Sequence, residues 1–154
     1  MNLKEYIRSI PDYPKKGILF RDITTLIKDE NAFAETINQI VERSKKFSFT
    51  KIAAIESRGF VFASAVSFVL NKPFIMLRKK NKLPADVHSV DFELEYGTAT
   101  IEVHKDSINE KDEVLIIDDL IATGGTAEAA AKLVEMNFDS DITCGQDLYV
   151  EFFS

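Results

Sequence analysis

The stretch Val114–Thr126, which reads VLIIDDLIATGGT, decides the fold of this chain. Its first four residues form an unbroken apolar run, which is typical of a strand buried on both faces of a parallel sheet. Asp118 and Asp119 follow at the carboxyl end of this strand, where open α/β sheets bind their ligands. The run Ala122–Thr126 then leads into a helix-forming segment, AEAAAKLVEM. We therefore expect a strand, an acidic pair, a small-residue loop and a helix in succession.

The loop and the acidic pair favour the same ligand. A small-residue loop that opens a helix directs several backbone N–H groups at one point, with the helix dipole behind them, and this suits phosphate. Neighbouring carboxylates favour hydroxyl groups or a metal rather than a second anion. A ribose 5-phosphate satisfies both halves, with its 2- and 3-hydroxyls donating to Asp118 and Asp119. The phosphate would be held by Ala122, Thr123, Gly124, Gly125 and Thr126.

The same stretch also has a simpler interpretation, as a solvated acidic turn after a strand and a glycine that ends a helix. That interpretation is preferred for either piece alone, but the coincidence of strand, acids and loop favours the ligand site. Two other phosphate motifs are excluded. No lysine follows the glycines, as a Walker A loop requires, and the chain has no G-x-G-x-x-G fingerprint for a dinucleotide.

Three further motifs stand in order along the chain, FRDIT at 20–24, ESRGF at 56–60 and LEYG at 94–97. With VLIIDDLIATGGT they closely resemble the adenine phosphoribosyltransferase family, whose members are type I phosphoribosyltransferases that bind phosphoribosyl pyrophosphate (PRPP). The resemblance covers Met1 to about Thr143. The last eleven residues, CGQDLYVEFFS, depart from the family's pattern, which puts stability, dimer contacts and full activity in question.

The resemblance implies an α/β fold with a central, mostly parallel sheet flanked by helices. Residues 1–154 would form a single phosphoribosyltransferase domain. Its parts would be a small hood over the base at 1–30, an antiparallel mobile flap at 79–103 and an atypical tail at 144–154. Local patterns add an amphipathic helix at 2–10, another at 30–47 and a loop at 83–91.

The hood would bind the base through Leu19, Phe20 and Arg21, because the family stacks an aromatic ring on the purine and reads its edge with backbone groups. Taken by itself, this segment favours a strand or loop anchored in the core, with Arg21 and Asp22 forming an exposed ion pair. The choice between these interpretations depends on the resemblance.

Pyrophosphate would be bound at the ends of two other apolar strands. KIAAI at 51–55 runs into a loop with Ser57 and Arg58, and PFIML at 73–77 runs into a basic cluster. The resemblance assigns both segments to pyrophosphate, with Arg78, Lys79 and Lys82 as the candidates in the cluster. A guanidinium fork suits such a ligand. The alternatives are a helix capped by Ser57 and a solvated basic loop.

The flap segment alternates apolar and polar residues around Gly97, as an antiparallel ribbon does. By resemblance, Glu95 and Tyr96 lie at its functional tip, and Glu95 assists protonation of the nitrogen by which the purine leaves. A solvent-facing glutamate on a ribbon is the alternative.

The composition of the chain argues against some classes of binding partner. The 154 residues carry a net charge of −6, which argues against nucleic acid or an anionic membrane surface as the main partner. The single cysteine, Cys144, cannot form an internal disulfide, and the start of the chain has no apolar signal region. No apolar run is long enough for a transmembrane helix. We therefore expect a cytoplasmic protein.

The resemblance implies transfer of the 5-phosphoribosyl group from PRPP to adenine, which gives AMP and pyrophosphate. It also implies Mg²⁺ bound with the substrate, no metal held by the protein itself, and a homodimer. Asp118, Asp119 and Glu95 would be the catalytic residues. Three alternatives stay open: an enzyme for another base, a non-catalytic regulator that senses PRPP, and a folded but impaired homologue.

Overall fold

A computed structural model describes residues 1–93, 97–118, 125–138 and 141–144, with only the backbone for 125–127 and 141–144. Its larger sheet has six strands in the order β5–β6–β4–β3–β7–β8. Four are mutually parallel: β3 (Lys51–Ile55), β4 (Phe74–Lys79), β7 (Glu113–Ile116) and β8 (Asp141–Cys144). The ribbon of β5 (Val87–Glu93) and β6 (Thr98–His104) joins antiparallel to β4. The predicted mostly parallel α/β fold is confirmed.

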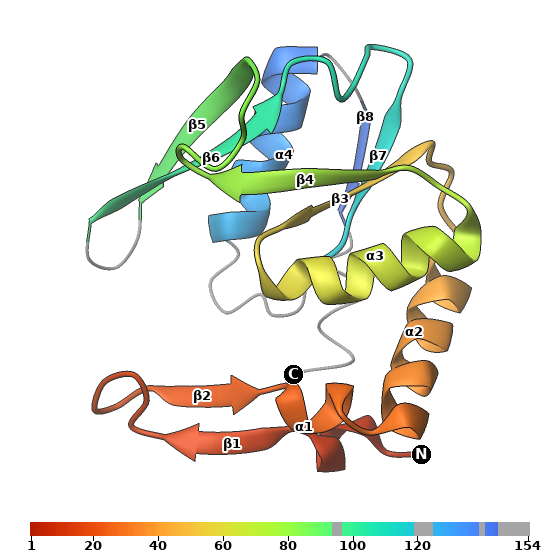
Figure 1. Cartoon of the computed structure of the whole chain (residues 1–154), viewed down its shortest axis with the longest axis vertical. Helices are drawn as coiled ribbons and strands as arrows, with labels where there is room; N and C mark the ends of the chain where they lie inside the picture. The colour runs from red at the N-terminus through yellow and green to blue at the C-terminus, as the bar shows by residue number, and fades with distance from the viewer. Residues whose placement is uncertain (94–96, 119–124, 139–140, 145–154) are drawn as a thin grey trace.

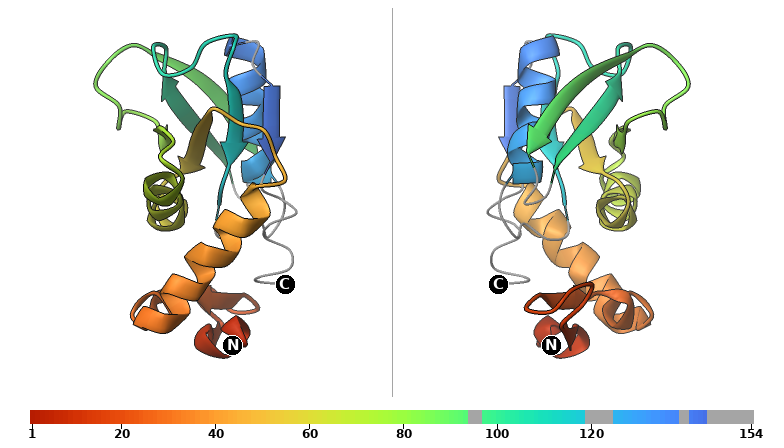
Figure 2. Two further views of the ribbon diagram at one scale, coloured as in Figure 1. Left: turned by 90° about the vertical axis from the view of Figure 1, so that its right-hand side faces the viewer. Right: turned by 90° about the vertical axis from the view of Figure 1, so that its left-hand side faces the viewer.

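Helices cover both faces of this sheet (Figure 2). On one side lie α2 (Glu30–Ser44) and α3 (Arg58–Leu70), and on the other lies α4 (Gly125–Phe138). Alternate side chains of β7 enter two different cores: Leu115 packs with α2 and α3, whereas Val114 and Ile116 pack with α4. Because successive side chains of a strand point to opposite faces, a strand between two cores must be apolar throughout. This is why the unbroken run at 114–117 is needed.

The N-terminal segment forms a small hood at one end of the molecule, beyond the first turn of α2 (Figure 1). It consists of η1 (Leu3–Tyr6), β1 (Arg8–Pro11), β2 (Leu19–Asp22) and α1 (Thr24–Ile27). The predicted helix at 2–10 is wrong beyond Tyr6. Residues 8–11 instead pair antiparallel with 19–22, since cross-strand bonds and an ion pair between Arg8 and Asp22 outweigh the weak helical periodicity.

Other predicted elements agree with the structure, with shifted ends. The helix expected at 30–47 ends at Ser44, and the helix after KIAAI begins at Arg58. The loop expected at 83–91 is wrong from Val87 onward, where β5 begins. Strand pairing with β6, from Val87 opposite His104 to Glu93 opposite Thr98, orders a segment whose own sequence has no strand period.

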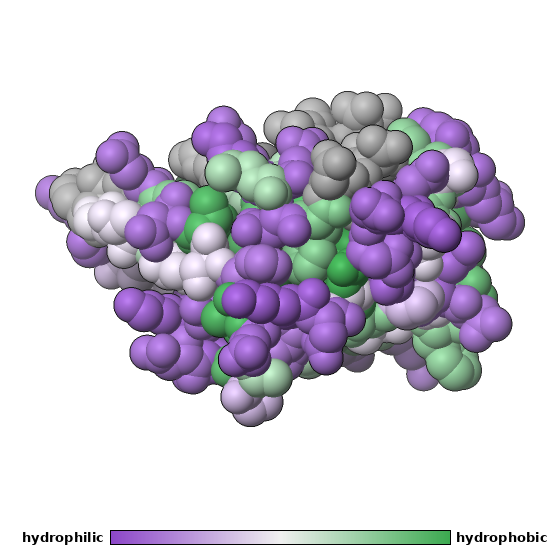
Figure 3. Space-filling view, turned by 90° about the horizontal axis from the view of Figure 1, so that it is seen from above, coloured by the Kyte–Doolittle hydropathy of each residue, from purple (hydrophilic) through white to green (hydrophobic). Residues whose placement is uncertain are grey.

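The surface seen from above is mostly hydrophilic, with small hydrophobic areas between the charged groups (Figure 3). In the part of the chain that the structure describes, no helix combines the length and the apolar character needed to cross a membrane.

Candidate functional site

Polar residues gather where three neighbouring parallel strands end. Glu56 follows β3, Lys79 ends β4 and Asp118 lies two residues beyond β7. These strands are adjacent in the sheet, so their carboxyl ends meet at one edge, where α/β folds place ligands. Asp118 is only 9% exposed, although it is a carboxylate at the end of a strand. The structure therefore brings the acidic motif and the two predicted pyrophosphate segments to one edge.

The loop after β3 approaches the acidic motif at Gly59. A β-carbon built on Gly59 would lie 3.3 Å from the carbonyl oxygen of Ile117 and 3.4 Å from Oδ1 of Asp118. The contact with the Ile117 oxygen would be tighter than most side chains permit, so the absent side chain allows the first turn of α3 to pack directly on the end of β7. The ESRGF motif and the acidic motif thus form one continuous surface.

Glu56 organises the basic cluster, a role that was not predicted for it. Its Oε1 accepts a 2.6 Å hydrogen bond from the backbone N–H of Lys79 and lies 3.3 Å from Nε of Arg78. The peptide bond between Glu56 and Ser57 is cis. Glu56 comes directly after a buried strand, as Asp118 does. The same sequence signal could therefore have identified Glu56 as a site residue.

Arg58 extends from this loop to the hood. Its Nη2 donates a 3.0 Å hydrogen bond to the carbonyl oxygen of Arg21, and its guanidinium carbon lies 5.3 Å from the centre of the Phe20 ring. Tyr13 packs edge-on against the same ring, with centroids 5.1 Å apart. The predicted base residues Phe20 and Arg21 therefore contact a predicted pyrophosphate residue, while the Leu19 side chain is exposed.

Asp22 fixes the far end of β2. It accepts hydrogen bonds from the hydroxyl and the N–H of Thr24, at 2.7 and 2.9 Å, and from Nε of Arg8 at 3.0 Å. The Thr24 hydroxyl, followed by the Arg8 guanidinium, lowers the pKa of Asp22 far below its ordinary value. The expected exposed ion pair of Arg21 with Asp22 is therefore not formed. Arg8 pairs with Asp22, and Nη1 of Arg21 donates to the hydroxyl of Ser9 at 2.7 Å.

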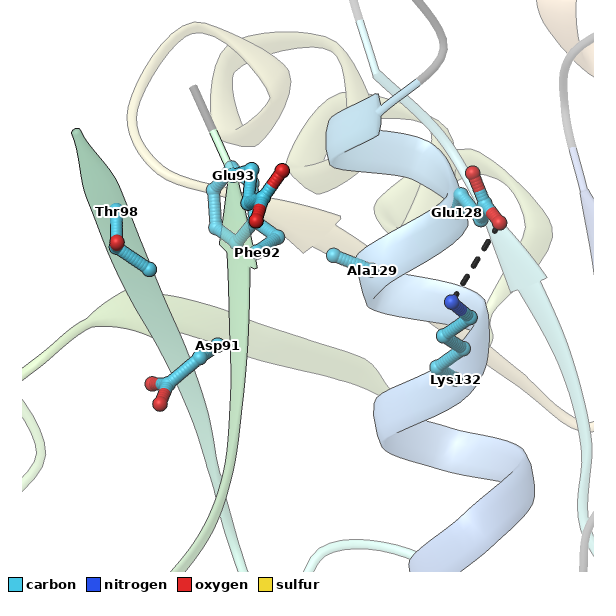
Figure 4. A pocket seen from close by; sticks show the side chains of 7 residues that line it. All are labelled: Asp91, Phe92, Glu93, Thr98, Glu128, Ala129 and Lys132. Atoms are coloured by element: carbon cyan, nitrogen blue, oxygen red, sulfur yellow. Dashed lines mark ion pairs between the residues drawn. The ribbon is translucent and has the colours of Figure 1, made fainter. Parts of the chain in front are cut away.

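A cavity of about 540 Å³ lies between one end of the β5–β6 ribbon and α4 (Figure 4). Asp91, Phe92, Glu93 and Thr98 line it from the ribbon, and Glu128, Ala129 and Lys132 line it from the helix. Lys132 lies 3.5 Å from Glu128 on the helix side. The rest of the ribbon packs on α4, where Ile101 and Val103 share a core with Leu133 and Val134.

Several predicted site residues lie outside the described residues, namely Glu95, Tyr96, Asp119, Ala122, Thr123 and Gly124. The backbone of Gly125 and Thr126 forms the beginning of α4, so a helix does start at the predicted loop. Ser57 and Lys82 are exposed at the site, and Lys82 closes a turn with its N–H 3.3 Å from the carbonyl oxygen of Lys79.

Comparisons of this chain with a family model and with curated proteins all point to one protein family. Residues 23–137 match the phosphoribosyl transferase domain. The chain is 84% identical over 137 residues to an adenine phosphoribosyltransferase of Pelagibacter ubique, covering 89% of this chain and 78% of that protein. It is 52% identical over 133 residues to one of Agathobacter rectalis, covering 86% of this chain and 76% of that protein.

Two solved structures show the same fold. The adenine phosphoribosyltransferase of Thermoanaerobacter pseudethanolicus is 41% identical, with a TM-score of 0.85, and the match covers 92% of this chain and 95% of that one. The Giardia lamblia enzyme, solved with 9-deazaadenine, is 37% identical, with a TM-score of 0.87 and coverage of 92% and 80%.

Proposed function

This chain belongs to the adenine phosphoribosyltransferase family, and from that membership we propose that it transfers the 5-phosphoribosyl group of PRPP to adenine. The products are AMP and pyrophosphate. The observation that carries the proposal is the close packing of Gly59 on Ile117 and Asp118, because it joins the pyrophosphate and ribose motifs in one site. Relatives that bind an adenine analogue support adenine as the base.

In this proposal each part of the site has a separate task. Asp118 and Asp119 hold the ribose hydroxyls and add negative potential beside the cation-like ribose of the transition state. The loop Ala122–Thr126 holds the 5-phosphate at the N-terminus of α4. Glu95 and Tyr96, on a mobile flap within residues 79–103, exclude water from the reacting ribose. Glu95 accepts the proton of the purine nitrogen as adenine attacks and returns it when the purine leaves in the reverse reaction.

The basic residues bind the departing pyrophosphate, and the hood at residues 1–30 binds the base. Ser57, Arg58, Arg78, Lys79 and Lys82 are the pyrophosphate group, which suits an anion with several oxygens. Leu19, Phe20 and Arg21 bind adenine by stacking and by backbone hydrogen bonds. The contact of Arg58 with Phe20 and Arg21 supports a site in which base and leaving group are adjacent.

In the proposed reaction, Mg²⁺ binds together with the substrate. Within the described ranges, no group of three or more His, Cys, Asp and Glu side chains is arranged to hold a metal. Mg²⁺ commonly binds through one or two carboxylates together with substrate phosphates and water, and Asp118 offers such a carboxylate. When bound, the ion would offset negative charge on the pyrophosphate.

We also propose a homodimer and a cytoplasmic location. Exposed apolar side chains on α3 and the neighbouring β4 support the dimer, since Phe68 is 87% exposed and Val69 and Met76 are also exposed. Single apolar residues are common on surfaces, but several on two contacting elements favour a protein interface. The single cysteine supports the location.

The experiment that tests the function is AMP formation from adenine, PRPP and Mg²⁺, with hypoxanthine, guanine, xanthine and orotate as parallel substrates. We expect product from adenine alone. Equal rates with another base would overturn the specificity. No product with any base, together with PRPP binding measured by calorimetry, would identify a PRPP-binding protein without catalysis and would refute the proposal.

A further inference from the structure

Glu102 occupies the centre of the sheet region that joins the flap to the basic cluster. It lies on β6 opposite Ser89 of β5 on one side and opposite Arg78 of β4 on the other. One residue is therefore in register with both the flap strand and the strand that carries the pyrophosphate residues.

The side chain of Glu102 is 7% exposed, and both of its oxygens are bonded. Oε2 accepts a 2.7 Å hydrogen bond from the hydroxyl of Ser89, and Oε1 accepts a 2.8 Å hydrogen bond from the backbone N–H of Asn81. Burying a carboxyl group is costly unless its oxygens are paired, so a glutamate at this position requires both partners.

The bond to Asn81 reaches the middle of the basic turn, which we define as residues 79–82. Asn81 has a φ of +69°, in the left-handed region that asparagine adopts more readily than most other non-glycine residues. The same turn is held at its start by Glu56, whose Oε1 accepts from the N–H of Lys79. Two carboxylates from different strands thus fix the backbone of a turn whose side chains are cationic.

We propose that Glu102 is a positioning residue for pyrophosphate binding: it holds the basic turn so that Lys79 and Lys82 face the leaving group, and it links this turn to the flap. The inference rests on the proposed function. In this role Glu102 acts on the turn through the N–H of Asn81 and makes no contact with substrate. Its bond to Ser89 fixes the carboxylate to the neighbouring strand of the ribbon.

The test compares Glu102→Ala with Glu102→Gln in the full chain. The glutamine can accept from Asn81 with its carbonyl oxygen and donate to the Ser89 hydroxyl with its amide, so it keeps both bonds. We expect Glu102→Gln to stay within about twofold of wild type. Glu102→Ala should raise the KM for PRPP and the inhibition constant of pyrophosphate about tenfold and leave the adenine KM nearly unchanged, as loss of a supporting hydrogen bond typically does.

Asp91→Ala is the matched control. It removes the 2.6 Å bond from Thr100 within the same ribbon and does not touch the basic turn, so we expect no change in the PRPP KM. If Glu102→Ala does not fold, Glu102→Met replaces it, because methionine fills similar space without an acceptor. A parallel rise in the KM of adenine and PRPP, or no change in either with a folded variant, would overturn the inference.

Amide hydrogen exchange of Asn81 gives a readout that does not depend on activity. We expect faster exchange in Glu102→Ala than in wild type and in Glu102→Gln. Wild-type protein that forms no AMP would refute the proposed function alone, whereas unchanged exchange of Asn81 in Glu102→Ala would refute the anchoring role of Glu102 alone.

Discussion

Gly59 and Asp118 lie so close together that a β-carbon on Gly59 would come within 3.4 Å of Oδ1 of Asp118. The same carbon would lie 3.3 Å from the carbonyl oxygen of Ile117, so Gly59→Ala should push on that backbone and shift the adjoining carboxylate that is proposed to bind ribose. We expect kcat/KM for PRPP to fall about tenfold, as small misplacements at reacting groups do. The melting temperature should change little, because alanine favours the helix while the crowding opposes it. Ser64→Ala, on the exposed side of α3, is the control, and an unaltered kcat/KM for Gly59→Ala would contradict the prediction.

The acidic pair is tested by the double variant Asp118→Asn with Asp119→Asn. The amides keep the size of the side chains but lose the charge that stabilises a cation-like ribose, so turnover should fall at least about 100-fold. Circular dichroism should show an intact fold. Asp106→Asn, at an exposed turn, controls for the loss of an acid, and rates like those of wild type in the double variant would refute the assigned roles.

Arg58 contacts the base residues and belongs to the proposed pyrophosphate group, so two substitutions separate its tasks. Arg58→Lys keeps the charge but loses the contact of the guanidinium with the Phe20 ring and the hydrogen bond from Nη2 to the Arg21 carbonyl oxygen. We expect it to raise the adenine KM about fivefold while the PRPP KM changes less. Arg58→Ala should raise both the adenine KM and the PRPP KM. The assignment fails if the lysine variant affects PRPP alone.

The hydrogen bonds that Asp22 accepts make the stability of the folded chain depend on pH. Because the Thr24 hydroxyl and Arg8 lower the pKa of Asp22 in the folded chain, the unfolded chain binds more protons at low pH. This stabilisation is complete above the ordinary aspartate pKa of about 4 and is lost as the pH falls below it. Asp22→Asn should lower the urea midpoint at pH 7, and its difference from wild type should shrink below pH 4. A constant difference across this range would exclude the linkage.

Phe68 tests the proposed dimer. Phe68→Glu places a charge on the exposed apolar side of α3, and sedimentation should then show a monomer where wild type shows a dimer. Met136→Glu alters an exposed apolar residue on α4 and should remain dimeric. A monomeric wild-type chain would refute the dimer. A dimeric Phe68→Glu variant would show that the interface does not include this side of α3.

The parallel part of the fold was predictable because its signals are local. Four apolar residues before Asp118 require a strand with two covered faces, and the two cores around β7 provide them. The positions of Glu56, Asp118 and the basic cluster at one edge follow from parallel strands alone.

The hood and the ribbon were harder to predict, because partners distant in sequence determine them. Arg8–Pro11 looks helical until it pairs with Leu19–Asp22. Val87 starts a strand only because β6 lies beside it, and the alternating sequence of β6 does not show that Glu102 is buried along with Ile101 and Val103. The contact of Arg58 with Phe20 joins residues that are 38 positions apart, and it forms only when the hood is folded.

The hood has its own two-stranded sheet, separate from the six strands that carry the acidic motif and the basic turn. Under the proposed function, mutations that reshape the hairpin of β1 and β2 would alter which base is accepted without changing the strand pairing beneath the phosphoribosyl group. Protein engineers could then vary nucleobase preference by randomising this hairpin, while they keep Leu3, which belongs to the core shared with α2 and α3.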